Sequence, residues 1–91
     1  MESQFVRSEL LLGRDSTAVL AGKKVALFGI GGVGSFVAEA LARSGIGHMM
    51  LVDDDAVSLS NLNRQLVALH STIGRPKVDV MRDRILDINP D

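Results

Sequence analysis

A glycine-rich turn, GIGGVG, gives the clearest chemical signal in this chain. Three of its glycines fit the pattern G-x-G-x-x-G, and a fourth adds room for close approach: Gly29, Gly31, Gly34 and Gly32. Without side chains, the backbone N–H groups of such a turn can bind an anionic ligand. Asp53 follows Gly34 by 19 residues, close to the spacing of about 20 at which a carboxylate meets ribose hydroxyls. The two features together predict a site for a nucleotide.

The segments around the turn are those that would position it. Residues 24–28 and 48–53 are apolar runs without alternation, which predicts two strands buried on both faces in a parallel sheet. Between them lies a helix whose expected inner face has helical spacing: Val33, Val37, Ala40, Leu41 and Ser44. Strand, turn, helix and strand form the βαβ unit of a Rossmann-like α/β fold.

The rest of the chain flanks this unit. Residues 1–22 are expected to form an N-terminal helical segment, and residues 23–91 the N-terminal part of a nucleotide-binding domain. A short helical turn is expected near residues 61–65. A last helix should begin near Arg75 with Pro76 in its first turn, and bury a stripe of Val78, Met81, Ile85 and Ile88. Its arginines and aspartates alternate, which is typical of an ordinary charged face with i,i+4 partners: Arg75, Arg82, Arg84, Asp79, Asp83 and Asp87.

A second group of polar residues follows the second strand: Asn61, Arg64, Gln65 and Lys77. Loops at the carboxyl ends of parallel strands border the ligand crevice, so Arg64 and Lys77 can face phosphates on the glycine turn. Two cations there suit a triphosphate attacked at its α-phosphorus, because they neutralise the transferring and leaving groups. A solvated surface position for each cation and an NAD or FAD site remain alternatives. No P-loop pattern is present.

Composition limits the alternatives further. The chain has 91 residues, 10 Lys and Arg, 11 Asp and Glu, and a net charge of −1, so no strong basic field directs it to nucleic acid or a membrane. It has no Cys, which excludes a disulfide or a cysteine nucleophile within it. We expect a cytoplasmic protein with no membrane segment. Only two parallel strands fit, which leaves little core, so we expect an incomplete domain that belongs to a longer enzyme or needs a partner.

Taken as a whole, the sequence resembles the ThiF/HesA/MoeB family, bacterial relatives of the ubiquitin-activating enzymes. Three stretches carry the resemblance: GIGGVGSFVAEALARSGIG, LVDDDAVSLSNLNRQ and IGRPKVDVMRDRILDINP. Within the family, the segments RSELLLG and ALARSGIG are most similar to the tRNA threonylcarbamoyladenosine dehydratases.

The resemblance implies adenylation, in which ATP activates a carboxylate as an acyl-adenylate and pyrophosphate is released. In the dehydratase branch the carboxylate belongs to threonylcarbamoyladenosine in tRNA, and an intramolecular attack then closes a ring. In the thiamine and molybdopterin branches it is the C-terminal glycine of a small sulfur-carrier protein. Since this chain is not basic, tRNA would contact a part of the enzyme outside these residues, or a dimer surface. An NAD(P)- or FAD-binding module and a non-catalytic fragment are the remaining alternatives.

The resemblance also implies roles for individual residues. Asp53 would hold the ribose, Asn61 and Gln65 would line the ATP site, and Arg64 and Lys77 would contact phosphate. Arg7 matches an arginine that reaches the partner's ATP in dimeric relatives, which implies a homodimer with Arg7, Arg64 and Lys77 as the catalytic cations. The magnesium ligand of the family lies in a later strand, so no metal ligand is expected here. Asp54 replaces the usual apolar residue of the D-x-D strand end, and Asp55 is left with two interpretations, ordering the loop or lying near a metal.

Overall fold

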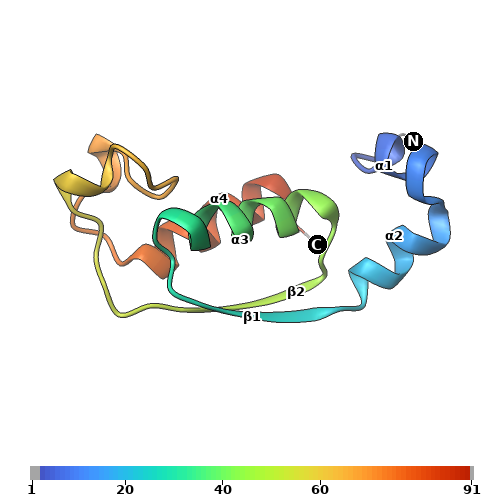
Figure 1. The fold of residues 1–91 in the computed structure, drawn as a ribbon, viewed down its shortest axis with the longest axis horizontal. Helices are drawn as coiled ribbons and strands as arrows, with labels where there is room; N and C mark the ends of the chain where they lie inside the picture. The colour runs from blue at the N-terminus through green and yellow to red at the C-terminus, as the bar shows by residue number, and fades with distance from the viewer. Residues whose placement is uncertain (1–2, 91) are drawn as a thin grey trace.

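The computed structural model describes residues 3–90, so residues 1, 2 and 91 of the expected segments lie outside it. Two strands pair in parallel, and the structure also has four α-helices and two 3₁₀ turns. The molecule is elongated, 41 × 22 × 19 Å, with the N-terminal helices at one end and the loop after the second strand at the other (Figure 1). In chain order the elements are α1 (Val6–Leu12), α2 (Arg14–Ala21), β1 (Lys24–Phe28), α3 (Gly32–Ser44), β2 (His48–Val52), η1 (Leu59–Asn61), η2 (His70–Thr72) and α4 (Lys77–Ile88).

The expected βαβ unit is present. β1 and β2 run parallel, in a register that pairs Lys24 with His48 and Phe28 with Val52. Helix α3 makes the connection between them, and its C-terminal end is closed by Gly45 in the left-handed conformation. The carboxyl ends of both strands therefore meet at one edge, where the glycine turn leaves β1 and Asp53 leaves β2.

The expectation that both strands are buried on both faces is wrong for the described residues. Helices α3 and α4 lie on one face of the sheet (Figure 1), and both strands alternate between exposed and half-buried positions. Phe28 is 78% exposed and Met50 62% exposed on the other face. An unbroken apolar run predicts two covered faces only where helices lie on both sides.

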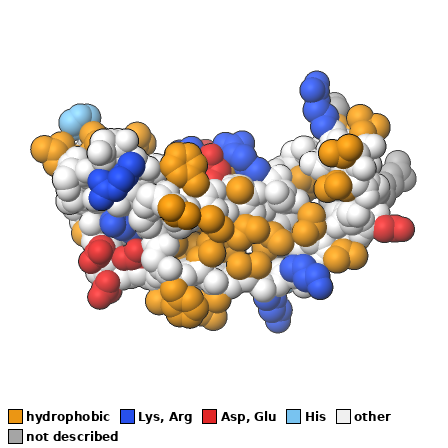
Figure 2. Space-filling model, in the orientation of Figure 1, with side chains coloured by type: hydrophobic (Ala, Val, Ile, Leu, Met, Phe, Trp, Pro, Cys, Tyr) orange, Lys and Arg blue, Asp and Glu red, His pale blue; other side chains and the backbone are white. Residues whose placement is uncertain are grey.

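The expected inner face of α3 is also wrong. The fully buried residues of α3 are small, namely Ser35, Ala38 and Ala42, whereas Val33 is 81% exposed. Small side chains face the sheet because the helix starts directly from the glycine turn and packs close to β1. The larger apolar side chains consequently point outward, and Figure 2 shows hydrophobic side chains gathered over α3.

Helix α4 begins at Lys77 with Pro76 as its N-cap and ends at Ile88 with Asn89 as its C-cap, close to the predicted bounds. Of its predicted stripe only Met81 is fully buried, and Val80 is buried beside it. The expected i,i+4 pairs on its charged face are absent from residues 3–90.

Two arginines of this region instead pair with residues that lie further away in the sequence. Arg75 bonds Asp83 at 2.8 Å, and Arg84 bonds Glu39 of α3. The hydrogen bond and charge of Arg84 hold the pKa of the Glu39 carboxyl below its usual range, against a smaller opposing effect of burial. The pattern of alternating charges did not predict this pair because Glu39 lies on another helix, which tertiary packing brings alongside α4.

The N-terminal helices α1 and α2 stand apart from the nucleotide turn. Phe5 rests on Gly45, where its ring lies 3.4 Å from the position a Cβ would take, and the Gln4 amide donates a 2.9 Å hydrogen bond to the Ile88 carbonyl. These contacts fix the segment against the far ends of α3 and α4 (Figure 1). None of the described helices has the length and apolar character needed to cross a membrane.

The main core lies at the loop end of the molecule. Its members come from the glycine turn, α3, the loop after β2 and α4: Ile30, Ala38, Val57, Val67, Ala68, Val80 and Met81. Burying residues from four segments in one cluster fixes the loop over the turn. The core thus positions the segments that carry the predicted site residues.

Candidate nucleotide site

The glycine turn has a shape that side chains would prevent. Gly29 has a φ of 93°, in the region that L-residues rarely adopt. A Cβ on Gly34 would lie 2.0 Å from the carbonyl oxygen of Gly29, far inside van der Waals contact. The first turn of α3 therefore passes directly over the end of β1, and its free N–H groups face the sheet edge.

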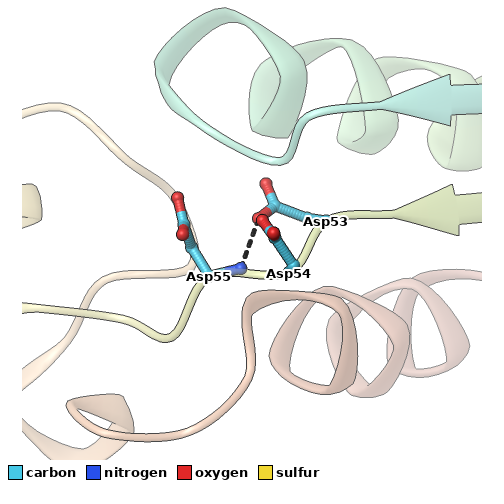
Figure 3. Close-up of side chains that lie close together, drawn as sticks. All are labelled: Asp53, Asp54 and Asp55. Carbon is cyan, nitrogen blue, oxygen red and sulfur yellow. Dashed lines mark hydrogen bonds between the residues drawn. The ribbon is translucent and has the colours of Figure 1, made fainter.

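Asp53 binds this turn from the neighbouring strand. Its carboxylate accepts a 2.6 Å hydrogen bond from the Ile30 N–H. It also accepts a 2.8 Å hydrogen bond from the Asp55 N–H (Figure 3). Partial burial raises the pKa of Asp53, but these two hydrogen bonds and the nearby charge of Lys77 outweigh it and hold the pKa below its usual range. The group is a carboxylate at neutral pH, and its remaining lone pairs are available to hydroxyl donors.

The three consecutive carboxylates form a compact group at the end of β2. Oxygens of Asp53, Asp54 and Asp55 all lie within 4.8 Å of one another, and Asp54 and Asp55 are exposed (Figure 3). The main chain of Asp55 joins this strand end to α4, because its carbonyl accepts a 3.0 Å hydrogen bond from the Lys77 N–H. Asp53 is already bound to two backbone N–H groups, so its main local role is to order the turn.

Lys77 is a buried cation at the start of α4. The residue as a whole is 6% exposed, and within residues 3–90 no hydrogen bond or ion pair involves its ammonium group. A short bridge between Ala56 and Pro76, together with the bond to Asp55, holds the start of the helix beside the strand end. Lys77 thus places a cation near the Asp53 carboxylate, where a phosphate on the glycine turn could also bind it.

Arg64 and Gln65 approach the turn from the loop. The aliphatic stem of Arg64 lies 3.8 Å from the position of a Cβ on Gly32, and the side-chain nitrogen of Gln65 lies 3.8 Å from that of Gly31. Gln65 is 7% exposed, and its carbonyl oxygen is buried without a hydrogen-bond partner among the described residues. Such an oxygen normally has a donor, so the site is suited to a ligand that supplies one.

Arg64 is exposed, whereas Gln65 is buried. The Arg64 guanidinium donates to the Ser60 carbonyl at 3.2 Å and to the Asn63 side chain at 2.8 Å. These are local contacts within the loop that a phosphate could replace, because charge-assisted hydrogen bonds are the stronger kind.

Asn61 has a structural contact in this molecule. Its side-chain oxygen accepts hydrogen bonds from the Ser58 N–H at 2.9 Å and the Ser58 hydroxyl at 3.1 Å. Its carbonyl accepts from the N–H groups of Arg64 and Gln65. Asn61 therefore shapes the loop that carries the other two residues. The predicted helical turn starts earlier than expected, at Leu59, because Ser58 and Asn61 cap it reciprocally.

Arg7 does not join the other predicted residues within one chain. It is exposed on α1, at the opposite end of the long axis from the glycine turn (Figure 1). The structure thus brings together the glycine turn, Asp53, Arg64, Gln65 and Lys77, but leaves Arg7 apart.

One residue at the site was not predicted from the sequence. Ser35, in the first turns of α3, is fully buried and bonds the loop through its hydroxyl. Ser35 lies outside the predicted inner face, because that face runs through Val33 and Val37 and the structure buries a different face of α3. The sequence did carry a signal for this residue: Ser35 shares a helix face with the small residues Ala38 and Ala42.

Comparison with known proteins places this arrangement in a family. The sequence profile of the ThiF family matches residues 5–91, and the chain belongs to that family. It is 57% identical over 91 residues to the tRNA threonylcarbamoyladenosine dehydratase of Bacillus subtilis (strain 168), a match that covers 100% of the chain and 36% of that protein. It is 42% identical over 76 residues to the molybdopterin-synthase adenylyltransferase of Escherichia coli (strain K12), covering 84% of the chain and 30% of that protein.

A solved structure shows the same fold. The crystal structure of the E. coli tRNA N6-threonylcarbamoyladenosine dehydratase in complex with ATP superposes with a TM-score of 0.93 at 45% identity, covering 96% of this chain and 36% of that one. The predicted Rossmann-like fold and family resemblance are therefore confirmed. The chain spans about a third of the length of these relatives.

Proposed function

We propose that the protein is an ATP-dependent adenylating enzyme that activates a carboxylate. A carboxylate oxygen attacks the α-phosphorus of ATP, an acyl-adenylate forms, and pyrophosphate leaves. The observation that carries this proposal is the position of Lys77, a residue only 6% exposed whose charge lies near the Asp53 carboxylate that binds the glycine turn. A hydride-transfer site holds its pyrophosphate mainly on backbone amides, whereas cations here favour an attacked triphosphate. The relative bound to ATP has the same fold at this site.

The site residues are proposed to divide the nucleotide among them. The turn Gly29–Gly34 cradles phosphates on its N–H groups, and Asp53 accepts ribose hydroxyls with the lone pairs that its backbone contacts leave free. Lys77 and Arg64 neutralise the phosphates, and Gln65 supplies an acceptor oxygen. Magnesium would accompany the triphosphate, with its protein ligand outside residues 1–91.

We infer that the carboxylate belongs to threonylcarbamoyladenosine in tRNA, with ring closure as the second step. The support is the 57% identity to a protein named as a dehydratase of that nucleoside. The alternative is a small sulfur-carrier protein, which the 42% identity to the molybdopterin-synthase adenylyltransferase favours. In either case residues 23–91 would provide the ATP site, and residues 1–22 the helical segment that carries Arg7.

Pyrophosphate exchange tests the adenylation step. The purified protein should exchange labelled pyrophosphate into ATP only with its carboxylate substrate, and modified tRNA and a sulfur-carrier protein would be compared. Lys77→Met keeps the aliphatic stem and removes the charge, so exchange should fall by about tenfold or more. Lys24→Met is the matched control, because Lys24 is exposed at the start of β1, away from the turn. Saturable binding of NAD with no binding of ATP would refute the proposal.

A homodimer is proposed to complete the site, because Arg7 lies too far along the molecule to serve its own chain (Figure 1). Mixing two impaired variants, Arg7→Ala and Lys77→Met, tests this directly. If Arg7 acts on the partner's site, each mixed dimer has one intact site, and about a quarter of the activity should return in an equal mixture. No recovery in demonstrably mixed dimers would show that Arg7 does not act across the interface.

A further inference from the structure

The hydroxyl of Ser35 joins α3 to the loop that faces the glycine turn. Ser35 is 0% exposed. Its Oγ donates a 3.2 Å hydrogen bond to the Gly32 carbonyl and accepts a 3.3 Å hydrogen bond from the Leu66 N–H. Within residues 3–90 the bond from Leu66 is the one hydrogen bond between residues 59–72 and α3. One side chain therefore connects the first turn of the helix with the loop.

The bond from Leu66 lies next to the residues of the loop that approach the glycine turn. Leu66 follows directly after Arg64 and Gln65, the two residues that lie over the glycines. On the other side of Leu66, Val67 is fully buried in the core. Arg64 and Gln65 thus lie on a loop anchored by the Asn61 turn before them and by Ser35 and Val67 after them. Without the Ser35 contact, the Leu66 N–H loses its partner and the segment between these anchors is freer to move away from the turn.

We propose that Ser35 is a positioning residue for nucleotide binding, which holds Arg64 and Gln65 in place over the glycine turn. The inference rests on the proposed ATP site, and it concerns a residue that does not touch the nucleotide. The Ser35 hydroxyl serves as donor and acceptor at once, because its bond to the Gly32 carbonyl orients Oγ so that a lone pair faces the Leu66 N–H. The expected consequence is selective, since the loop supplies contacts to phosphates and the ribose lies at Asp53.

Replacing the serine tests the proposal. Ser35→Ala should weaken ATP binding roughly tenfold, the size expected for one lost buried hydrogen bond, and should change adenosine binding less than twofold. Ser35→Cys keeps a weak acceptor of similar size and should give an intermediate ATP affinity. Ser44→Ala is the matched control: the Ser44 hydroxyl bonds the Ala40 carbonyl at 2.8 Å within the same helix, at the end away from the glycine turn, so ATP affinity should not change.

A double-mutant cycle distinguishes positioning from a general loss of stability. In an Arg64→Ala background, Ser35→Ala should cost less ATP affinity than it does alone, because one of the two contacts it supports is already gone. Equal losses for ATP and adenosine, or full additivity with Arg64→Ala, would overturn the proposal. If Ser35→Ala does not fold, hydrogen exchange at Leu66 in the unsubstituted protein decides: ATP should slow it, and unchanged exchange counts against the role. If the unsubstituted protein binds no ATP, the proposed function itself fails.

Discussion

Gly34 offers the sharpest test of the geometry of the glycine turn. A Cβ at this position would lie 2.0 Å from the Gly29 carbonyl oxygen and 3.1 Å from its carbonyl carbon. A backbone carbonyl cannot rotate away as a flexible side chain can, so the start of α3 must move by about 1 Å. Gly34→Ala should therefore cost about 3 kcal/mol, the upper end of ordinary overpacking. This is a large share of the roughly 5–15 kcal/mol that stabilises a typical domain.

The neighbouring Gly32 provides a matched control. A Cβ on Gly32 would meet only the Arg64 side chain at 3.8 Å, so Gly32→Ala should leave stability unchanged or raise it by about 0.5 kcal/mol. Urea unfolding followed by far-ultraviolet circular dichroism measures both, since the chain has no Trp or Tyr. The midpoint for Gly34→Ala should fall by about 1–3 M, with ATP binding lost. Equal midpoints for the two variants would refute the close approach of helix and strand.

Two further predictions concern charges. Asp53→Asn leaves one acceptor oxygen but presents an amide NH₂ to the second N–H, and should cost about 1–3 kcal/mol at pH 7. Because the pKa of folded Asp53 is lowered, its contribution exists above the unfolded pKa of about 3.9 and is lost as pH falls through the folded value. The difference from the unsubstituted protein in urea unfolding should shrink from pH 7 to pH 3, and a difference that grows would contradict this sign. Glu39→Gln removes the pair with Arg84, whose side chain is 36% exposed, and should cost about 0.5 kcal/mol, less in 1 M salt. A double-mutant cycle with Arg84→Gln checks it, and zero coupling at low salt would show that the pair contributes nothing.

The local pattern of the sequence predicted the strands, the turn and the order of the elements. β1 lies at residues 24–28 as predicted, because a short apolar run bounded by Lys and Gly has few other stable conformations. α4 begins within two residues of its predicted start, since Pro76 fixes the backbone before it. These features depend on neighbours in the chain and are readable without a tertiary structure.

Faces and partners were less predictable. The outward position of Val33 and the burial of Ser35 follow from how closely α3 approaches the sheet, and apolar spacing carries no information on that distance. The pair between Glu39 and Arg84 joins residues 45 apart in sequence. A periodic pattern identifies which residues share a helix face, but the packing of other segments decides which face is covered.

For the candidate site, the sequence by itself determined which residues have suitable chemistry: the glycines, Asp53, Arg64, Gln65 and Lys77. Tertiary structure decided how they are used. It showed that the Asp53 carboxylate orders the turn through Ile30, that Lys77 is a buried residue near Asp53, and that α1 with Arg7 lies at the other end of the molecule. The reason is physical: residue type and spacing fix charge and local conformation, whereas burial and hydrogen-bond partners depend on segments distant in the chain that meet only in the folded protein.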